Sequence, residues 1–292
     1  LIIGVLLGTT VVKQSVIDDL RRRADTALNA TDRLRADVND LNSEVQEWEA
    51  FGRSAEPLLV SGRLTGSTMV MVTTQGSDPA TVDGVRGALR DAGAEVAAVL
   101  VLTPRMALPD EQARSAMAQV LGVADSTPPA DLSRQAAARL GERLVLGPPT
   151  DAAADVVRLL ASSSFLQVAP GSAIDGLGGP DQPVIVLSGG QAVLAPAPDA
   201  FDLPLLTSLV QQDHPVAAAE AEVTANALVS LVRGDAALDG AVLTVDNVDS
   251  MPGRIALVVG LEGVLDANLG ACGDFGVKTG ACALLPQPSP TP

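Results

Sequence analysis

A repeating pattern of apolar and small residues constrains this chain more than any other feature. Successive members stand three and four positions apart in alternation: Ile17, Leu20, Ala24, Ala27, Thr31, Leu34, Val38, Leu41, Val45 and Trp48. This is the heptad spacing of a coiled coil, and its β-branched first and leucine fourth positions favour a parallel dimer. We therefore predict a coiled-coil stalk at residues 13–52, ended by Gly52 and Pro57. Its homodimer interface would comprise Ile17, Leu20, Leu34, Val38, Leu41, Val45 and Trp48. The alternative is a single helix that packs on its own head domain.

The residues before the stalk are apolar from Leu1 to Val12, apart from Thr9 and Thr10. A membrane-spanning helix needs about 20 mostly apolar residues. We therefore expect residues 1–12 to be the C-terminal part of a transmembrane helix that begins before Leu1. A cleaved signal peptide is the alternative, but no small-x-small cleavage site precedes the charged stretch 13–23, and the helical pattern continues through it.

Beyond residue 65, short β-branched runs alternate with helical periodicity. The predicted strands are 68–74, 95–102, 165–168, 184–187, 216–219, 241–245 and 255–261. The predicted helices are 79–92, 110–121, 132–144, 151–162, 201–211 and 223–232. Such alternation requires crossover connections and produces a mostly parallel sheet with helices on both faces. We therefore predict an α/β fold, with one Rossmann-like, doubly wound head domain at 65–285 and a disordered Pro-rich tail at 286–292.

Charge and composition argue against nucleic acid as a partner. The chain has 19 basic and 35 acidic residues and a formal charge of -16, so its surface repels phosphate backbones. Aromatic residues make up 2% of the sequence, with one Trp and no Tyr, so platforms for base stacking are not expected.

Several short motifs occur in an order that resembles one known family. They are residues 7–10 at the end of the apolar segment, the coiled coil that follows, and residues 69–72, 245–249, 252–255 and 273–276. In this order, over essentially the whole chain, they resemble the actinobacterial MctB/SteB family of single-pass membrane proteins with a coiled coil. The resemblance, with the cysteine pair near the C-terminus, implies a head that lies outside the cytoplasm, in the cell envelope. The sparse catalytic motifs predict that the protein is not an enzyme.

The resemblance implies two different functions. In the first, which the residues favour, the chain is a dimeric scaffold or regulator of cell division that promotes cell separation and cell-wall hydrolysis with a SteA-like septal protein. The alternative is copper transport or copper homeostasis in the envelope, with copper as the bound metal.

Copper handling needs clustered soft ligands, and the sequence offers few. His214 is the one histidine, and its place before Pro215 at a strand start suits a polar turn. Met69 and Met71 share one face of a predicted buried strand, where core packing explains them. A disulfide between Cys272 and Cys282 fits an oxidising exterior best, with metal thiolates and free thiols as alternatives. No metal ligand is assigned.

Motifs of catalysis are equally sparse. A Ser-His-Asp triad would need His214, and the Gly-x-Ser-x-Gly pattern is absent. Residues 188–190, after a predicted strand, form the most site-like loop but lack a phosphate-binding pattern. Residues 276–279 lack the Gly-Lys step of a phosphate loop. Asp246 and Asp249 fit a solvated acidic turn better than a paired-carboxylate site. We expect no catalytic residue and no cofactor.

Overall fold

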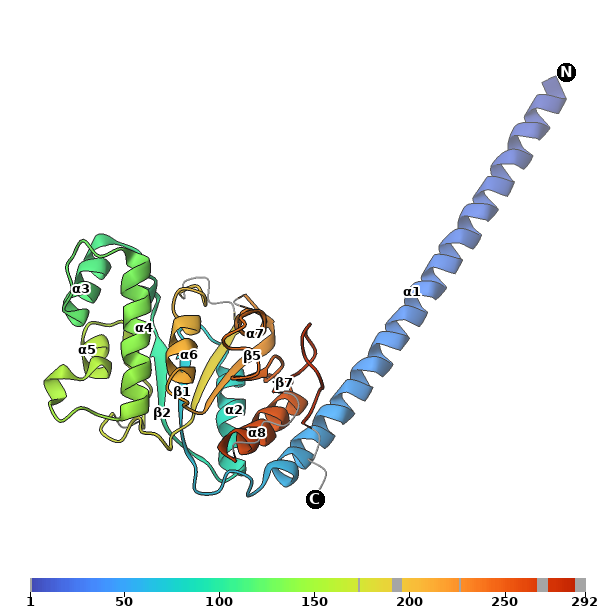
Figure 1. Cartoon of the computed structure of the whole chain (residues 1–292). Helices are drawn as coiled ribbons and strands as arrows, with labels where there is room; N and C mark the ends of the chain where they lie inside the picture. Colours follow the sequence, from blue (N-terminus) through green and yellow to red (C-terminus); the bar gives the residue numbers. More distant parts are fainter. Residues whose placement is uncertain (1, 173, 191–195, 226, 267–272, 287–292) are drawn as a thin grey trace. The chain divides into compact units, whose positions relative to one another are not determined.

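A computed structural model describes the backbone of residues 2–172, 174–190, 196–225, 227–266 and 273–286, and their side chains from residue 18 onward. The chain divides into two compact units, Leu1–Ser54 and Ala55–Pro292. The first unit is a single helix and the second is an α/β head (Figure 1). Residues 287–292 of the predicted tail lie outside the described part.

Helix α1 (Ile2–Val60) is longer than the predicted stalk. The helix itself continues to Val60, past Gly52 and Pro57, while the first compact unit ends at Ser54. Its last turn belongs to the head, where Val60 is fully buried. The Glu56 carboxylate there pairs with the Arg254 guanidinium through two hydrogen bonds of 2.6 and 2.7 Å. These contacts offset the backbone hydrogen bond that Pro57 cannot donate.

The predicted membrane anchor at residues 1–12 is helical from Ile2 onward. Its side chains lie outside the described part of the structure. Within the part that is described, none of the helices combines the length and apolarity needed to cross a membrane.

The apolar residues of the heptad pattern form a stripe along α1. We term Leu20, Leu34, Val38, Leu41, Val45 and Trp48 the heptad stripe; each of these side chains is 53–64% exposed. The side chain of Ile17, the remaining predicted member, lies outside the described residues. Trp48 packs edge to face with Phe51, with 6.0 Å between the ring centroids. The apolar face of an amphipathic helix normally lies against another element, so this stripe offers a surface for a partner.

The head is built on a seven-stranded sheet in the order β3-β2-β1-β4-β5-β6-β7. The strands are β1 (Thr68–Thr74), β2 (Glu95–Leu102), β3 (Leu166–Val168), β4 (Val184–Gly190), β5 (Val216–Thr224), β6 (Leu243–Val245) and β7 (Asp274–Phe275). All pairings are parallel except β2 with β3, which is antiparallel. The α/β class and the mostly parallel sheet are confirmed. The sequence pattern does not predict β7.

Helices cover both faces of the sheet (Figure 1). Against one face pack α2 (Pro79–Asp91) and α8 (Met251–Leu265), together with Met69 and Met71 of β1. Val70 and Val72 point to the other face, because successive strand residues alternate sides. The helices on that face are α3 (Glu111–Leu121), α4 (Pro129–Leu146), α5 (Val156–Ser162), α6 (Asp202–Val210) and α7 (Leu228–Gly234). The head therefore has two apolar cores, one on each side of the sheet.

The run 255–261, predicted as a strand, lies inside helix α8. Ser250 caps this helix by accepting a hydrogen bond from the Gly253 amide, and Pro252 stands in its first turn. Most of α8 is buried, so its own residues are apolar on nearly every side of the helix. A short apolar run of this kind fits a buried helix as well as a buried strand.

Other predicted boundaries shift by a few residues. Strand β5 continues to Thr224, so α7 begins at Leu228 rather than at 223. Strand β6 begins at Leu243 rather than at 241. The predicted helix 151–162 is divided into a short 3-10 helix (Ala152–Ala154) and α5.

Gly253 lies where the first turn of α8 crosses the loop that follows β6. A Cβ atom at this position would stand 2.0 Å from the carbonyl oxygen of Asn247. We expect Gly253→Ala to lower the free energy of unfolding by about 3 kcal/mol, because the helix must move away from the loop. Gly87→Ala in α2 is the matched control: its Cβ meets nothing within 4 Å, and alanine favours a helix over glycine by about 1 kcal/mol. Equal urea midpoints for the two variants would contradict this close approach.

Candidate functional site

The methionine and cysteine side chains that the sequence offers as soft metal ligands are, where the structure describes them, buried or disulfide-bonded. Met69 and Met71 are fully buried in the core on the α2 and α8 side of the sheet. Cys282 is disulfide-bonded, and Cys272, its predicted partner, lies outside the described residues. Among the residues that are described, no group of three or more His, Cys, Asp or Glu side chains could hold a metal ion.

His214, which a Ser-His-Asp triad would need, and Ser188, in the segment predicted as a site-like loop, lie at opposite ends of the sheet. His214 precedes β5, where its Nε2 is 2.9 Å from the carbonyl oxygen of Gln182, and burial lowers its pKa. Ser188 pairs with Glu220 of β5, near the carboxyl ends of the two parallel strands. Glu220 lies six residue steps after His214 along the chain, which is about 20 Å in extended conformation. Residues 188–190, predicted as a loop, belong to β4.

The two aspartates of the 245–249 motif have different environments. Asp249 is exposed and accepts a hydrogen bond of 2.9 Å from the Glu222 amide. Asp246 is fully buried, so the expectation of a solvated turn is wrong for this residue. Its Oδ2 lies 2.7 Å from Nη1 of Arg233, and its Oδ1 accepts a hydrogen bond of 2.7 Å from the Val277 amide.

Asp246 is the centre of a group of five charged side chains around the carboxyl end of β6. We term this group the charge cluster: Glu220, Arg233, Asp246, Asp274 and Lys278. Arg233 also lies 3.4 Å from Asp274 and donates a hydrogen bond of 2.9 Å to the Phe275 carbonyl oxygen. One arginine thus contacts two carboxylates and the backbone of β7.

Lys278 forms the second ion pair of the charge cluster. Its ammonium group lies 2.7 Å from the buried carboxylate of Glu220 and 3.1 Å from the carbonyl oxygen of Ala221. The other Glu220 oxygen accepts a hydrogen bond of 3.0 Å from the Val229 amide at the start of α7. The lysine of the segment 276–279 therefore points into the protein and serves the protein's own structure.

Gly276 allows the C-terminal segment to approach Asp246. Its φ is +131°, and a Cβ atom there would stand 2.1 Å from Oδ1 of Asp246. The motifs 245–249 and 273–276, which lie apart in the sequence, are therefore two halves of one contact. All three carboxylates of the charge cluster have a cation within the cluster, so its geometry suits fastening the C-terminal segment rather than binding a substrate.

Sequence reasoning missed Glu220, Arg233 and Lys278. The signal for Glu220 is a charged residue inside the alanine-rich run 217–221 of a strand, since a carboxylate on a buried strand requires a partner. Arg233 and Lys278 carry no such local signal, because their partners lie 13 and 58 residues away in the sequence.

Asp202, in the first turn of α6, is a second residue that the sequence does not single out. It is 4% exposed, and burial raises its pKa to about 7. The carboxyl group is therefore more readily protonated in the folded chain than in the unfolded one. The contribution of Asp202 to stability falls as the pH rises from about 4 towards 7, because the unfolded chain ionises more easily.

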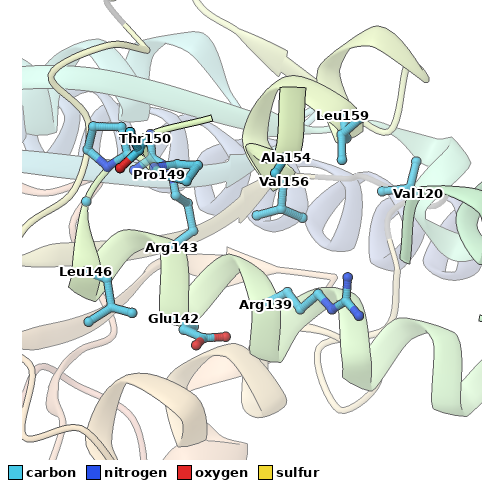
Figure 2. Close-up of a pocket in the computed structure, with 12 residues that line it drawn as sticks. Val120, Arg139, Glu142, Arg143, Leu146, Pro149, Thr150, Ala154, Val156 and Leu159 are labelled. Atoms are coloured by element: carbon cyan, nitrogen blue, oxygen red, sulfur yellow. The ribbon is translucent and has the colours of Figure 1, made fainter. Parts of the chain in front are cut away.

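A groove lies on the other side of the head, between α4, α5 and the loop at 147–150, and has a volume of about 640 Å³. Figure 2 shows Arg139 and Glu142 projecting from α4 along one side of it, with Val156 and Leu159 of α5 on the opposite side. The sequence does not single out this groove.

The fold and the charge cluster define a class of protein: an α/β head whose sheet edge fastens its own C-terminal segment, preceded by a long helix with an apolar stripe. A family model described as "Copper transport outer membrane protein, MctB" matches residues 1–286. The chain belongs to this MctB family of envelope proteins, as the order of the motifs predicts.

Relatives in mycobacteria bear the same name. Proteins named copper transporter MctB from Mycobacterium bovis and Mycobacterium tuberculosis are 25% identical to this chain over 298 residues, which cover 97% of it and 93% of each relative. A Mycobacterium leprae protein of that name is 38% identical over 73 residues, 25% of this chain and 22% of the relative. These relatives are named as transporters and not as enzymes.

The charge cluster predicts that loss of one arginine destabilises the head strongly. Arg233→Met removes the cation that faces Asp246 and Asp274 while leaving both carboxylates in place. We expect the free energy of unfolding, measured by urea denaturation, to fall by about 3–5 kcal/mol, because a buried charge is left uncompensated. The matched control is Arg134→Met, which breaks the exposed pair with Asp131 and should cost less than about 1 kcal/mol. Similar losses in both variants would contradict a structural role for the cluster.

Proposed function

We propose that this chain acts, without enzymatic activity, in copper homeostasis of the cell envelope. The observation that carries the proposal is the match to the copper transport family over residues 1–286, with relatives named copper transporters that cover 97% of the chain. The family match therefore favours the copper function over the scaffold function that the sequence favours.

The described residues limit how the head could serve copper. His214 is buried just before β5, and Met69 and Met71 are buried together in the core on the α2 and α8 side of the sheet. Among the described residues, no group of three or more His, Cys, Asp or Glu side chains could hold a metal ion. Copper normally requires several soft donors in a small volume. We therefore propose that the head acts on copper through its assembly with other chains and not through a preformed ligand site in its core.

We further propose that α1 pairs in parallel with α1 of a second copy. The support is the exposed heptad stripe, whose β-branched Val38 and Val45 occupy the first heptad position while Leu34 and Leu41 occupy the fourth. Side chains of this kind interlock across a parallel two-stranded coiled coil. The pairing would cover the stripe and place two heads at the same end of the stalk.

A dimeric septal scaffold with a SteA-like partner is the second candidate function. The exposed heptad stripe favours it, because such a surface serves assembly whether or not a metal is bound. The two functions differ in what the cell loses without the protein, and a genetic experiment separates them.

The genetic test deletes the gene and scores copper sensitivity and septal separation in the same cultures. We expect copper sensitivity, restored by the intact gene and equally by a variant with His214→Ala, Cys272→Ser and Cys282→Ser, because the function does not use these side chains as ligands. Rescue of copper tolerance by the intact gene alone would show that soft ligands matter. Chained cells with normal copper tolerance would reject the copper function in favour of the scaffold.

The coiled-coil proposal predicts a dimer that one charge can disrupt. We expect the full chain to sediment as a dimer in analytical ultracentrifugation, and Val38→Asp to sediment as a monomer, because two carboxylates would be buried opposite each other in the stripe. Asn39→Asp is the matched control, since it adds the same charge one residue away from the stripe and should leave the dimer intact. A monomeric wild-type chain would refute the pairing.

A further inference from the structure

The groove between α4 and α5 has the size and lining of a small-molecule site. Its volume of about 640 Å³ lies within the range of roughly 300–1,000 Å³ that is usual for such sites. Apolar residues from three helices line it: Val120 of α3, Leu146 of α4, and Val156 and Leu159 of α5. A ligand with an aliphatic group would remove these side chains from water.

The groove is held open by buried contacts that do not involve its two exposed charges. Arg143, on the floor, forms hydrogen bonds of 3.0 and 3.1 Å with the two oxygens of Asp155 and also donates to the carbonyl oxygen of Leu177. Asp155 in turn caps α5 through the Val157 amide. This network ties α4 to α5, so the groove exists before any ligand enters it, which lowers the entropic cost of binding.

Two charges of opposite sign remain available on the α4 side. Arg139 and Glu142 both line the groove, and neither forms an ion pair or side-chain hydrogen bond with any residue in the described part of the chain. Residues three apart on a helix have Cβ atoms about 5–6 Å apart. The groove therefore presents one cation and one anion side by side along an apolar wall.

From this arrangement we propose that the groove binds a short zwitterionic peptide, an aliphatic dipeptide. Its carboxylate would pair with Arg139 and its ammonium group with Glu142. An extended dipeptide spans about 7 Å, which long side chains from two Cβ atoms about 5–6 Å apart can bracket. Its aliphatic side chains would lie against Val156 and Leu159. A polyanion is disfavoured by Glu142, and a free metal cation is disfavoured by Arg139.

This inference does not rest on the copper function, and a binding experiment with the full chain tests it. The chain, with isotope-labelled Leu and Val methyl groups, is titrated with L-Val-L-Leu while its NMR spectrum is recorded. We expect saturable shifts of the methyl signals of Val120, Leu146, Val156 and Leu159. N-acetyl-Val-Leu-amide, which lacks both charges, should bind at least about tenfold more weakly, because two charge-assisted contacts are lost.

Substitutions of Arg139 and Glu142 then test whether each charge contributes to dipeptide binding. Arg139→Gln and Glu142→Gln should each weaken dipeptide binding by about tenfold or more. Both side chains are exposed, so the folded spectrum should persist. Arg90→Gln is the matched control: this exposed arginine on α2, on the opposite face of the sheet, should leave the affinity unchanged. The proposal is overturned if no methyl signal shifts saturably, if the blocked dipeptide binds as well as the free one, or if neither groove substitution lowers the affinity.

Discussion

The buried ion pair between Asp246 and Arg233 is the interaction on which the carboxyl edge of the head depends. It joins the residue after β6 to α7, and the same carboxylate accepts hydrogen bonds from the amides of the segment after β7. Separating these groups would leave a fully buried carboxylate without a partner, at a cost of several kcal/mol. Strand β7 pairs with β6 through only two residues, so the charge cluster adds to the few backbone hydrogen bonds that hold this strand in the sheet.

The charge cluster also determines where the head can meet other molecules. Doubly wound sheets usually bind ligands beyond the carboxyl ends of their strands. Here the protein's own segment 276–279 occupies that place over β5 and β6, with Lys278 inserted beside Glu220. The groove proposed above as a binding site is formed by other elements of the head, α4 and α5.

Much of the fold follows from local periodicity, whereas the charge cluster does not. The alternation of strands and helices, the start of α2 at Asp78 and the heptad spacing are readable because they depend on residues within one or two turns of each other. The continuation of α1 past Pro57 is not readable in this way, because the distant Arg254 holds Glu56 there. The run 255–261 is misread because a buried helix has the composition of a buried strand. Lys278 and Glu220 pair across 58 residues, which no local pattern reveals.

The net negative charge of the chain bears on how a head with few soft ligands could attract copper ions. A formal charge of -16 raises the concentration of cations near the surface without any specific site. Carboxylates attract copper but also the more abundant magnesium and calcium ions, which prefer oxygen ligands. Charge alone therefore gives attraction without selectivity. Selectivity for copper requires soft donors, and in the described head His214 and the two methionines of β1 are buried in packing.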